Sequence, residues 1–514
     1  MDALDILIGA DEKRVNDEAV LALSKCSELF QRAGELVRVV EHLDDGRLSP
    51  RIETLPDASL REKLAELVTF RAKGSAHVHP PDWCVRAVAA RSNWKGVRRL
   101  QSLVEYPVLL KSGQVLQNPG YDPESFLLYQ PSGSFLPVAT SPTDEELQKA
   151  RDRVLDLVVD FPFAQPVHKA AWLAGALTMF ARPGYDGSTP FFCIDGNVRG
   201  SGKSLLCDVA AMIATGRRAP RTTQVSDEAE ERKRITAVAR AGDSLILIDN
   251  IAKPFGNGSF DSALTSTTWK ERLLGQSEIQ SFPLLTVWWG TGNNIQFRAG
   301  ADTARRTLHI RLLSPEQNPE SRTDFKHPNL IAHVLSNRPQ LVADCLTMLR
   351  AHAVACKAGT APKLKSWGSF EGWSHVVRGA IVLAGLPDPL EAHEELARLA
   401  DTTANAHADL VLGWLDMCEQ QKAPDGCTAR EALEWLKEDL QAREENMIKE
   451  LRFTRLHDAL GELSRCNGRP LPDVNALGCT LRAYRDRTVE GYRLESGGKR
   501  SVKGGGQQWK ATKR

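Results

Sequence analysis

The chain has 514 residues, 42% of them hydrophobic and 25% charged, so it is long enough to form several globular domains. Its 66 Lys and Arg residues against 65 Asp and Glu leave a formal net charge of +1, which excludes a histone-like basic protein and an acidic disordered chain. The longest strongly apolar stretch, residues 170–180, is too short for a membrane span, and no basic segment precedes an apolar run at the N-terminus. We therefore expect a cytoplasmic protein with no membrane partner.

Residues 1–140 are predicted to form a mixed α/β domain. Apolar residues recur at helical spacing through residues 1–45, which predicts helix there. Between residues 104 and 138, short apolar runs separated by Gly and Pro indicate strands and turns. A small polar residue, Thr143, then precedes three acidic residues, a pattern that caps a helix and favours its N-terminal dipole. We therefore place the start of the next domain near residue 141.

Residues 141–315 are predicted to be an α/β core. Apolar runs at 191–194, 245–248, 284–289 and 308–312 alternate with helical stretches, which is typical of a parallel sheet covered by helices. Residues 316–422 are predicted to be a helical region that follows the core. A Pro- and Gly-containing break at residues 422–426 separates the last predicted domain, residues 423–514.

A glycine-rich segment directly follows the first predicted strand of the core. In such a turn the backbone amides and the helix N-terminus bind phosphate, the lysine reaches the β and γ phosphates, and the serine hydroxyl binds Mg²⁺. The usual first glycine is replaced by Asn197, a residue type that tolerates positive φ. An ordinary strand-to-helix turn is the alternative. The predicted ATP-binding residues are Asn197, Gly200, Ser201, Gly202, Lys203, Ser204 and Leu205.

A carboxylate ends the next apolar strand. Asp249 stands where a Walker B aspartate binds the Mg²⁺ shell, so Ser204 and Asp249 are the predicted metal ligands. A capping aspartate is the alternative. Asn250 follows, where many ATPases that hydrolyse ATP have a glutamate that activates water. Glu230 or Glu231 is a candidate replacement for that base, and an exposed charged helix face is the competing interpretation.

Two further polar groups follow the later strands of the core. Asn293 and Asn294 end the third strand, where an amide orients water near the γ phosphate; an Asn-containing turn is the alternative. Arg305 and Arg306 precede the fourth strand and suit an arginine finger that reaches the nucleotide of a neighbouring subunit. A solvated basic turn is the competing interpretation. The predicted catalytic residues are therefore Lys203, Asp249, Asn250, Asn293, Asn294, Arg305 and Arg306.

With these elements in order, residues 60–514 resemble the helicase portion of primase-helicase proteins of prophages and integrative elements. Those proteins are AAA+ P-loop ATPases related to superfamily 3 and MCM-like helicases. The resemblance implies a homo-hexameric ring that hydrolyses ATP to unwind DNA during replication. The 514 residues contain no evident set of primase catalytic carboxylates, so we expect a separately encoded primase as a partner. The segments that carry the resemblance are 80–83, 119–123, 160–163, 202–204, 248–250, 292–294, 305–306, 319–322 and 367–374.

The resemblance also suggests a DNA contact between the second and third strands of the core. Residues 269–280 lie where related motors have a pore hairpin, and Lys270 and Arg272 would then contact backbone phosphates. A surface hairpin with solvated charges is equally compatible with these residues.

The last domain is predicted to be a winged helix that binds DNA. Three helical patterns precede two short strands and a Gly-rich turn, which is the order of elements in that fold. Residues 476–514 contain ten Lys and Arg against three Asp and Glu, a local net charge of +7. A winged helix that binds protein, followed by a basic tail, is the alternative. The predicted DNA-binding residues of this domain are Arg482, Arg485, Lys499, Arg500 and Lys503.

Together these patterns predict an ATP-dependent DNA helicase that uses ATP and Mg²⁺ and acts on single-stranded or forked DNA. The rival hypothesis is an ATP switch without unwinding activity, a DNA-bound replication initiator or loader. Asn250 is the residue that favours this rival.

Overall fold

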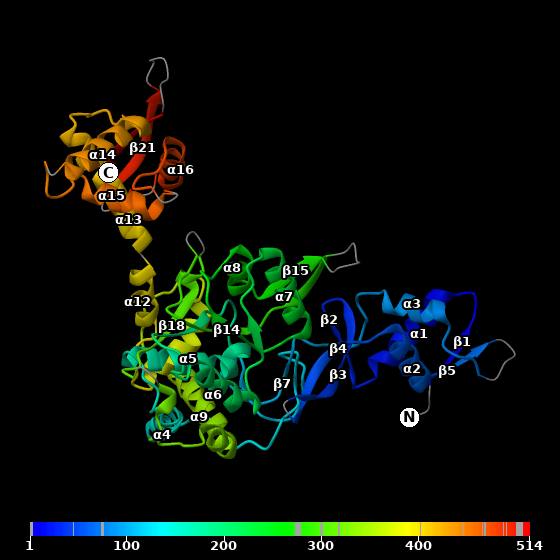
Figure 1. The fold of residues 1–514 in the computed structure, drawn as a ribbon. Coiled ribbons are helices and arrows are strands. Elements are labelled where there is room, and N and C mark those ends of the chain that lie inside the picture. Colours follow the sequence, from blue (N-terminus) through cyan, green and yellow to red (C-terminus); the bar gives the residue numbers. More distant parts are fainter. Residues whose placement is uncertain are drawn as a thin grey trace. The chain divides into compact units, whose positions relative to one another are not determined.

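The computed structural model describes residues 4–44, 46–72, 77–272, 279–298, 302–316, 319–400, 402–445, 447–464, 466, 469–486, 488–489, 491–499 and 507–513. The chain forms two compact units, Met1–Leu396 and Ala397–Arg514 (Figure 1). The division into four domains with boundaries near 141, 316 and 423 stays a prediction. The mixed α/β class, with a parallel sheet in the core, is confirmed.

The first unit begins with two small sheets and three helices. Strand β1 (Leu4–Ile8) pairs in parallel with β5 (Val68–Ala72). A second sheet has the order β4-β3-β2-β6. Its strands are β4 (Arg47–Thr54), β3 (Glu35–Asp44), β2 (Leu29–Arg32) and β6 (Arg98–Arg99). The helices are α1 (Glu12–Ser24), α2 (Asp57–Leu67) and α3 (Asp82–Ala89).

The prediction of helix through residues 1–45 is right for α1 and wrong for β1, β2 and β3. Ala33 and Gly34 both have positive φ, 52° and 80°, and they join β2 to β3 in a two-residue hairpin turn. Such turns require positive φ at both central residues and match the twist of paired strands. The turn therefore reverses the chain and pairs two apolar segments that helical spacing alone had joined.

Short strands follow, as the sequence predicts for residues 104–138. They are β7 (Ser102–Val104), β8 (Val108–Leu109), β9 (Val115–Leu116), β10 (Gly120–Asp122) and β11 (Leu127–Tyr129). The predicted helix start is confirmed as well, because α4 (Asp144–Asp156) begins with a capping box. There the Thr143 hydroxyl accepts from the Glu146 backbone N–H at 3.2 Å, and Glu146 accepts from the Thr143 N–H at 2.8 Å.

The core sheet has five parallel strands in the order β13-β14-β17-β12-β18. They are β13 (Arg221–Thr223), β14 (Leu245–Ile251), β17 (Val287–Asn293), β12 (Phe191–Gly196) and β18 (Thr307–Leu312). Four of these strands were predicted from their apolar runs. The edge strand β13 was missed because it has only three residues and no apolar run.

Helices cover both faces of this sheet (Figure 1). Phe192 and Ile194 of β12 face one core, with α5 (Pro166–Ala181), α6 (Lys203–Thr215) and α9 (Leu330–Ala358). Phe191 and Cys193 face the other, with α7 (Glu228–Ala241) and α8 (Gly258–Thr265). Because the strands are parallel, the ends of β12, β14 and β17 lie at the same edge of the sheet.

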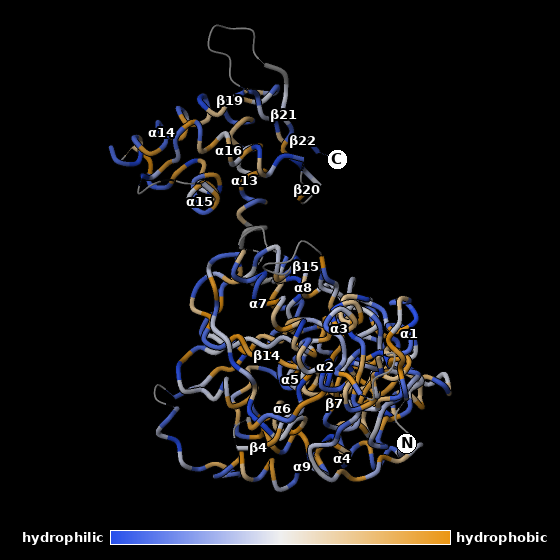
Figure 2. Tube along the Cα trace, turned by 90° about the vertical axis from the view of Figure 1, so that its right-hand side faces the viewer, coloured by the Kyte–Doolittle hydropathy of each residue, from blue (hydrophilic) through white to orange (hydrophobic). Residues whose placement is uncertain are grey.

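The rest of the first unit is helical, as predicted for much of residues 316–422. Its elements are η1 (Arg182–Gly184), η2 (Ala304–Arg306), η3 (Pro319–Ser321), α10 (Glu371–Trp373), η4 (Ser374–Arg378) and α11 (Gly379–Leu383). Helix α12 (Leu390–Ala400) contains the boundary between the two units, after Leu396. Hydrophobic and hydrophilic residues are interspersed along the chain (Figure 2). Within the described ranges, no helix is long and apolar enough to cross a membrane.

The second unit packs four helices against an antiparallel sheet of order β19-β22-β21-β20. The helices are α13 (Thr402–Gln420), α14 (Ala429–Glu444), α15 (Thr454–Leu463) and α16 (Val474–Tyr484). The strands are β19 (Cys427–Thr428), β20 (Thr488–Val489), β21 (Tyr492–Lys499) and β22 (Gln507–Lys513). The two predicted ribbon segments are thus part of a larger sheet. α13 also belongs to this unit, because the Trp414 ring N–H donates to the backbone oxygen of Trp509 at 3.0 Å.

Candidate nucleotide-binding site

The glycine-rich segment joins the end of β12 to the start of α6. Gly200 and Gly202 have φ of 72° and 84°, which side chains rarely adopt. A Cβ on Gly202 would lie 2.8 Å from a ring carbon of Phe161, and one on Gly200 would lie 2.5 Å from Glu320 Cγ. Backbone conformation therefore favours glycine at both positions, and at Gly202 the packed ring of Phe161 excludes a side chain as well.

Asn197 acts differently from the glycine it replaces. It does not take the positive φ that was expected of it, so that explanation is wrong. Its side-chain Nδ2 instead donates to the backbone oxygen of Ser314, and its Oδ1 accepts from the Ser314 N–H, both at 3.0 Å. The amide thus fastens the start of the loop to the chain that leaves β18.

Lys203 is the first residue of α6, and its ammonium group folds back onto the loop. Its Nζ donates to the backbone oxygen of Val198 at 2.9 Å and to Ser201 Oγ at 3.0 Å. Burial lowers the pKa of Lys203, and the carboxylate of Asp195 opposes that shift. A half-buried cation surrounded by loop oxygens is well placed to exchange them for phosphate oxygens.

Ser204, Asp249 and Thr291 come from three elements and meet at one carboxylate oxygen. The Ser204 hydroxyl donates to Asp249 Oδ1 at 2.8 Å, and the Thr291 hydroxyl donates to the same atom at 2.5 Å. Mg²⁺ prefers oxygen ligands and often binds through one or two protein oxygens together with substrate phosphates, so Ser204 and Asp249 fit the ion. In the described part of the chain, no group of three His, Cys, Asp or Glu residues forms a further metal site.

Thr291 was missed by the sequence analysis, although it lies in the segment before Asn293. It lies inside β17, which pairs with both β12 and β14 and so runs between the phosphate loop and Asp249. This pairing is visible in the structure and leaves no signal in the sequence. The Thr291 hydroxyl also accepts from the backbone N–H of Asn250 at 3.2 Å. Thr291 therefore orients the strand end that carries the predicted metal ligand.

Arg221, at the start of β13, is a second residue that sequence reasoning missed. It donates to Asp208 Oδ2 at 2.7 Å and lies 3.4 Å from Asp249 Oδ2. Burial raises the pKa of Asp208, and Arg221 opposes that shift. No local pattern marks Arg221, because its partners lie on α6 and β14, away from it in sequence.

Asn250 has a structural reason for its identity. Its φ is 59°, and the pairing of β14 with β17 shifts register between Ile248 and Ile251. Asn adopts this left-handed conformation more readily than Glu does. Its side chain is exposed at the bulge.

The two asparagines at the end of β17 have different surroundings. Asn293 lies opposite Gly196 in the sheet, and its Oδ1 is buried with no hydrogen-bond partner among the described residues. Asn294 instead accepts from an Arg311 guanidinium nitrogen at 2.8 Å, and Arg311 also pairs with Asp195. Asn293 is therefore the better candidate for orienting water, whereas Asn294 helps to hold the strand ends together.

The two candidate finger arginines also differ. Arg306 is 14% exposed and lies near two carboxylates, Asp302 at 3.1 Å and Asp261 at 3.5 Å. Arg305 is 65% exposed and pairs only with Asp302, at 2.7 Å, among the contacts of the described residues. Arg305 is thus the arginine with the reach to contact a second subunit.

Glu230 and Glu231 lie in the first turn of α7. Glu230 is exposed and pairs with Lys233 at 2.6 Å. Glu231 is 3% exposed, and burial raises its pKa. The exposed-face interpretation therefore holds for Glu230 and is wrong for Glu231, because α7 turns Glu231 into the protein.

The predicted DNA-contacting residues lie outside this cluster. Lys270 and Arg272 are exposed on β15 (Thr268–Arg272), which pairs with β16 (Ile279–Pro283); residues 273–278 lie outside the described residues. In the second unit Arg482 is exposed, and Arg485 pairs with Asp486 at 3.0 Å. Lys499 ends β21, whereas Arg500 and Lys503 lie outside the described residues.

Comparison with known proteins adds little to this geometry. No protein-family model and no curated protein matches the chain. Many solved structures resemble it, among them the A form apo structure of the NrS-1 C-terminal region, CTR(305-718). That similarity covers 85% of each chain at 10% identity and a TM-score of 0.39. The site must therefore be interpreted from its own residues.

Proposed function

We propose that the chain is a Mg²⁺-dependent ATP hydrolase with a P-loop core of the AAA+ type. The observation that carries the proposal is the 2.8 Å hydrogen bond between Ser204, at the start of α6, and Asp249, at the end of β14. It puts a hydroxyl and a carboxylate together beside a glycine-rich loop and its lysine, the set of groups that holds a nucleotide triphosphate with its metal ion.

Each group then has a defined task. The backbone amides of residues 197–205 and the ammonium of Lys203 bind the phosphates, and Ser204 and Asp249 hold Mg²⁺. The bound metal ion neutralises charge that develops on the phosphates. Thr291 orients Asp249, and the amide of Asn293 is available to orient the attacking water.

We further propose that ATP hydrolysis drives a DNA helicase that acts in replication as a homo-hexameric ring, with a primase supplied by another chain. Exposed Arg305 supports a site completed by a neighbouring subunit, and exposed Lys270 supports contact with DNA in the ring. The basic segment 476–514, proposed to belong to a winged helix, would bind DNA as well.

An ATP switch that loads or initiates without unwinding is the second candidate. Asn250 favours it, because an amide at this position cannot remove a proton from water. Its exposed, left-handed conformation means that the backbone, and not only the chemistry, constrains this residue. The two candidates differ in whether DNA strands separate.

The test measures ATP turnover and strand displacement on one preparation of the full chain. We expect DNA-stimulated turnover, which Lys203→Ala reduces by at least about 100-fold because a donor to the transferred phosphate is lost. Lys149→Ala is the matched control, since this lysine is exposed on α4 and forms an ion pair with Glu145, one turn before it. Unchanged turnover in Lys203→Ala contradicts the phosphate-loop proposal, and turnover without strand displacement favours the ATP switch.

A further inference from the structure

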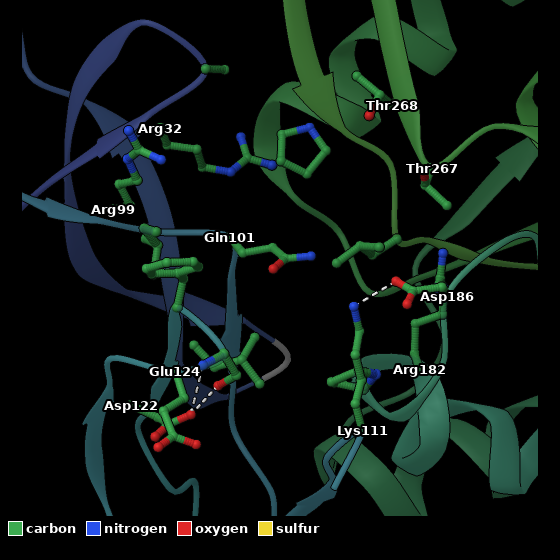
Figure 3. A pocket seen from close by; sticks show the side chains of 18 of the residues that line it. Arg32, Arg99, Gln101, Lys111, Asp122, Glu124, Arg182, Asp186, Thr267 and Thr268 are labelled. Atoms are coloured by element: carbon green, nitrogen blue, oxygen red, sulfur yellow. Dashed lines mark hydrogen bonds and ion pairs between the residues drawn. The ribbon is translucent and has the colours of Figure 1, made fainter. Parts of the chain in front are cut away.

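A cavity of about 910 Å³ lies in the first unit, and none of the predicted ATP-binding residues lines it (Figure 3). Its walls come from the β2–β3 turn, the chain between residues 92 and 127, η1, and the base of the hairpin formed by β15 and β16. It is large enough for a ligand of several hundred Å³. The proposed nucleotide site gives no reason for a cavity at this place.

Two buried arginines belong to the wall of this cavity. Arg32 and Arg182 are each 6% exposed, and the Nε atom of each is buried without a hydrogen-bond partner among the described residues. Arg32 donates to two backbone oxygens at the end of α7, at 2.8 and 2.9 Å, and Arg182 donates to one backbone oxygen at 3.1 Å. Among the described residues, no carboxylate lies within ion-pair distance of either guanidinium, although the charge of Glu35 acts on Arg32. The cavity wall therefore holds buried positive charge that no direct ion pair neutralises.

The other charged residues that line the cavity do not neutralise the two buried arginines. Arg99 is exposed on the same side as Arg32, whereas Lys111 and Asp186 neutralise each other at 2.5 Å. Figure 3 shows Asp122 and Glu124 together at one end, away from Thr267 and Thr268. The cavity therefore has a positive region suited to an anion.

An aromatic ring completes the wall. Phe126 is 39% exposed and has a φ of 58°, a conformation that is unfavourable for a bulky side chain. Arginines line the same cavity. Proteins use a partly exposed ring in this way to stack a nucleic-acid base while cations hold the phosphates.

The cavity also continues to the predicted DNA-contacting hairpin. Thr267 and Thr268 at the start of β15, and Ser281 on β16, line it. Lys270 lies two residues further along the same strand and is exposed. A single strand that touches Lys270 therefore needs to extend only along β15 to enter the cavity.

We propose that this cavity binds a short stretch of single-stranded nucleic acid, with its phosphates attracted by the charges of Arg32, Arg99 and Arg182 and a base stacked on Phe126. The inference rests on the proposed function in one respect: the helicase proposal is the reason for choosing DNA over other phosphate-containing ligands. It adds a strand-binding site within one subunit, separate from the site of ATP hydrolysis.

The test measures binding of a fluorescein-labelled oligothymidylate to the full chain without ATP. Phe126→Ala is expected to weaken binding about tenfold, the loss typical of one stacked base. Arg99→Ser is expected to weaken it several-fold and to reduce the slope of log affinity against log salt by about 0.7. The matched controls are Leu136→Ala, an exposed apolar residue outside the cavity, and Arg86→Ser, an exposed arginine on α3.

Unchanged affinity and salt slope in both cavity variants would overturn the inference, provided that thermal melting shows them folded. Arg99 is exposed, so its variant keeps the test valid if Phe126→Ala fails to fold. Equal affinity of the unmodified chain for thymidine monophosphate and the oligonucleotide would assign the cavity to a free nucleotide instead. ATP turnover of the unmodified chain tests the proposed function separately. If the unmodified chain hydrolyses ATP and both variants bind DNA normally, the proposed strand-binding site is wrong and the proposed function stands.

Discussion

The core sheet and the basic end of the second unit present their polar residues in different ways. In the core, Ser204, Asp249 and Thr291 come from three elements and share one carboxylate oxygen within 2.8 Å. In the second unit, Arg482 is exposed on α16 and Arg485 pairs with its neighbour Asp486. The first arrangement is held by directed hydrogen bonds, and the second contributes charge to a surface.

This difference determines what a single substitution does in each region. Removing one member of a hydrogen-bonded cluster leaves the others misplaced, so the loss is large and specific to one step. Removing one of several surface charges takes away one phosphate contact and leaves the rest. Experiments on the core should therefore give steep effects, and those on the basic end should give graded ones.

The largest effect in the core is expected at Arg305, which the cluster in its own subunit does not include. Arg305→Ala should lower ATP turnover about 10³-fold, as loss of an arginine finger does, whereas Arg306→Ala should mainly destabilise its own turn. Mixing Arg305→Ala with Lys203→Ala subunits should restore part of the activity, because some interfaces then combine an intact loop with an intact arginine. Steady-state turnover across mixing ratios measures this.

Two outcomes would contradict this role of Arg305. If no mixing ratio recovers turnover although the two differently tagged variants co-purify, the arginine acts within its own subunit. If Arg305→Ala hydrolyses ATP normally, the ion pair with Asp302 is its whole function.

A smaller effect is expected at Thr291, which touches Asp249 but is not predicted to contact the nucleotide. Thr291→Val keeps the shape and removes the hydroxyl, so Asp249 loses its 2.5 Å hydrogen bond and the Mg²⁺ requirement should rise 10- to 100-fold, the range typical of groups that orient a metal ligand. Thr291→Ser keeps the hydroxyl and should restore the normal requirement. Turnover measured against Mg²⁺ concentration checks both, and an unchanged requirement in Thr291→Val would limit Thr291 to packing.

The sequence indicates candidate residues of the core site more readily than the contacts between them. The strand order could not be inferred from it, so the pairing of β17 with both β12 and β14, which brings Thr291 to Asp249, was not foreseen. Arg221 was missed for the same reason, since its partners are distant in sequence. Apolar runs, by contrast, predicted four of the five strands, because burial on both faces leaves a strong local pattern.

Two other predictions, the helix through residues 1–45 and the positive φ of Asn197, were wrong because the backbone took a different conformation. Ala33 and Gly34 form a hairpin turn inside a stretch whose spacing resembles a helix, and turn geometry prevailed over periodicity. Asn197 was expected to replace a glycine through its φ, but its side chain bonds to Ser314, 117 residues away. In both cases the local sequence is compatible with two conformations, and contacts made only in the folded chain decide between them.

The smallest effect is expected at the basic end, and its test must spare the core of the second unit. Deleting residues 476–514 would remove Leu477, Leu494 and Trp509, all buried in that core. Loss of DNA binding by the truncated chain would then reflect unfolding as much as lost charge. Single substitutions of exposed cations separate the two effects.

Arg482→Gln and Lys510→Gln change only exposed side chains of the basic segment. Each should weaken DNA binding a few-fold and reduce the salt slope by about 0.7 to 0.9, because a neutralised phosphate no longer releases its counterions. Lys437→Gln is the matched control, since this lysine is exposed on α14 and lies outside the basic segment. Fluorescence anisotropy over a range of salt concentrations measures affinity and slope together. Equal slopes in all three variants and the unmodified chain would leave DNA contact to the hairpin that carries Lys270 and Arg272.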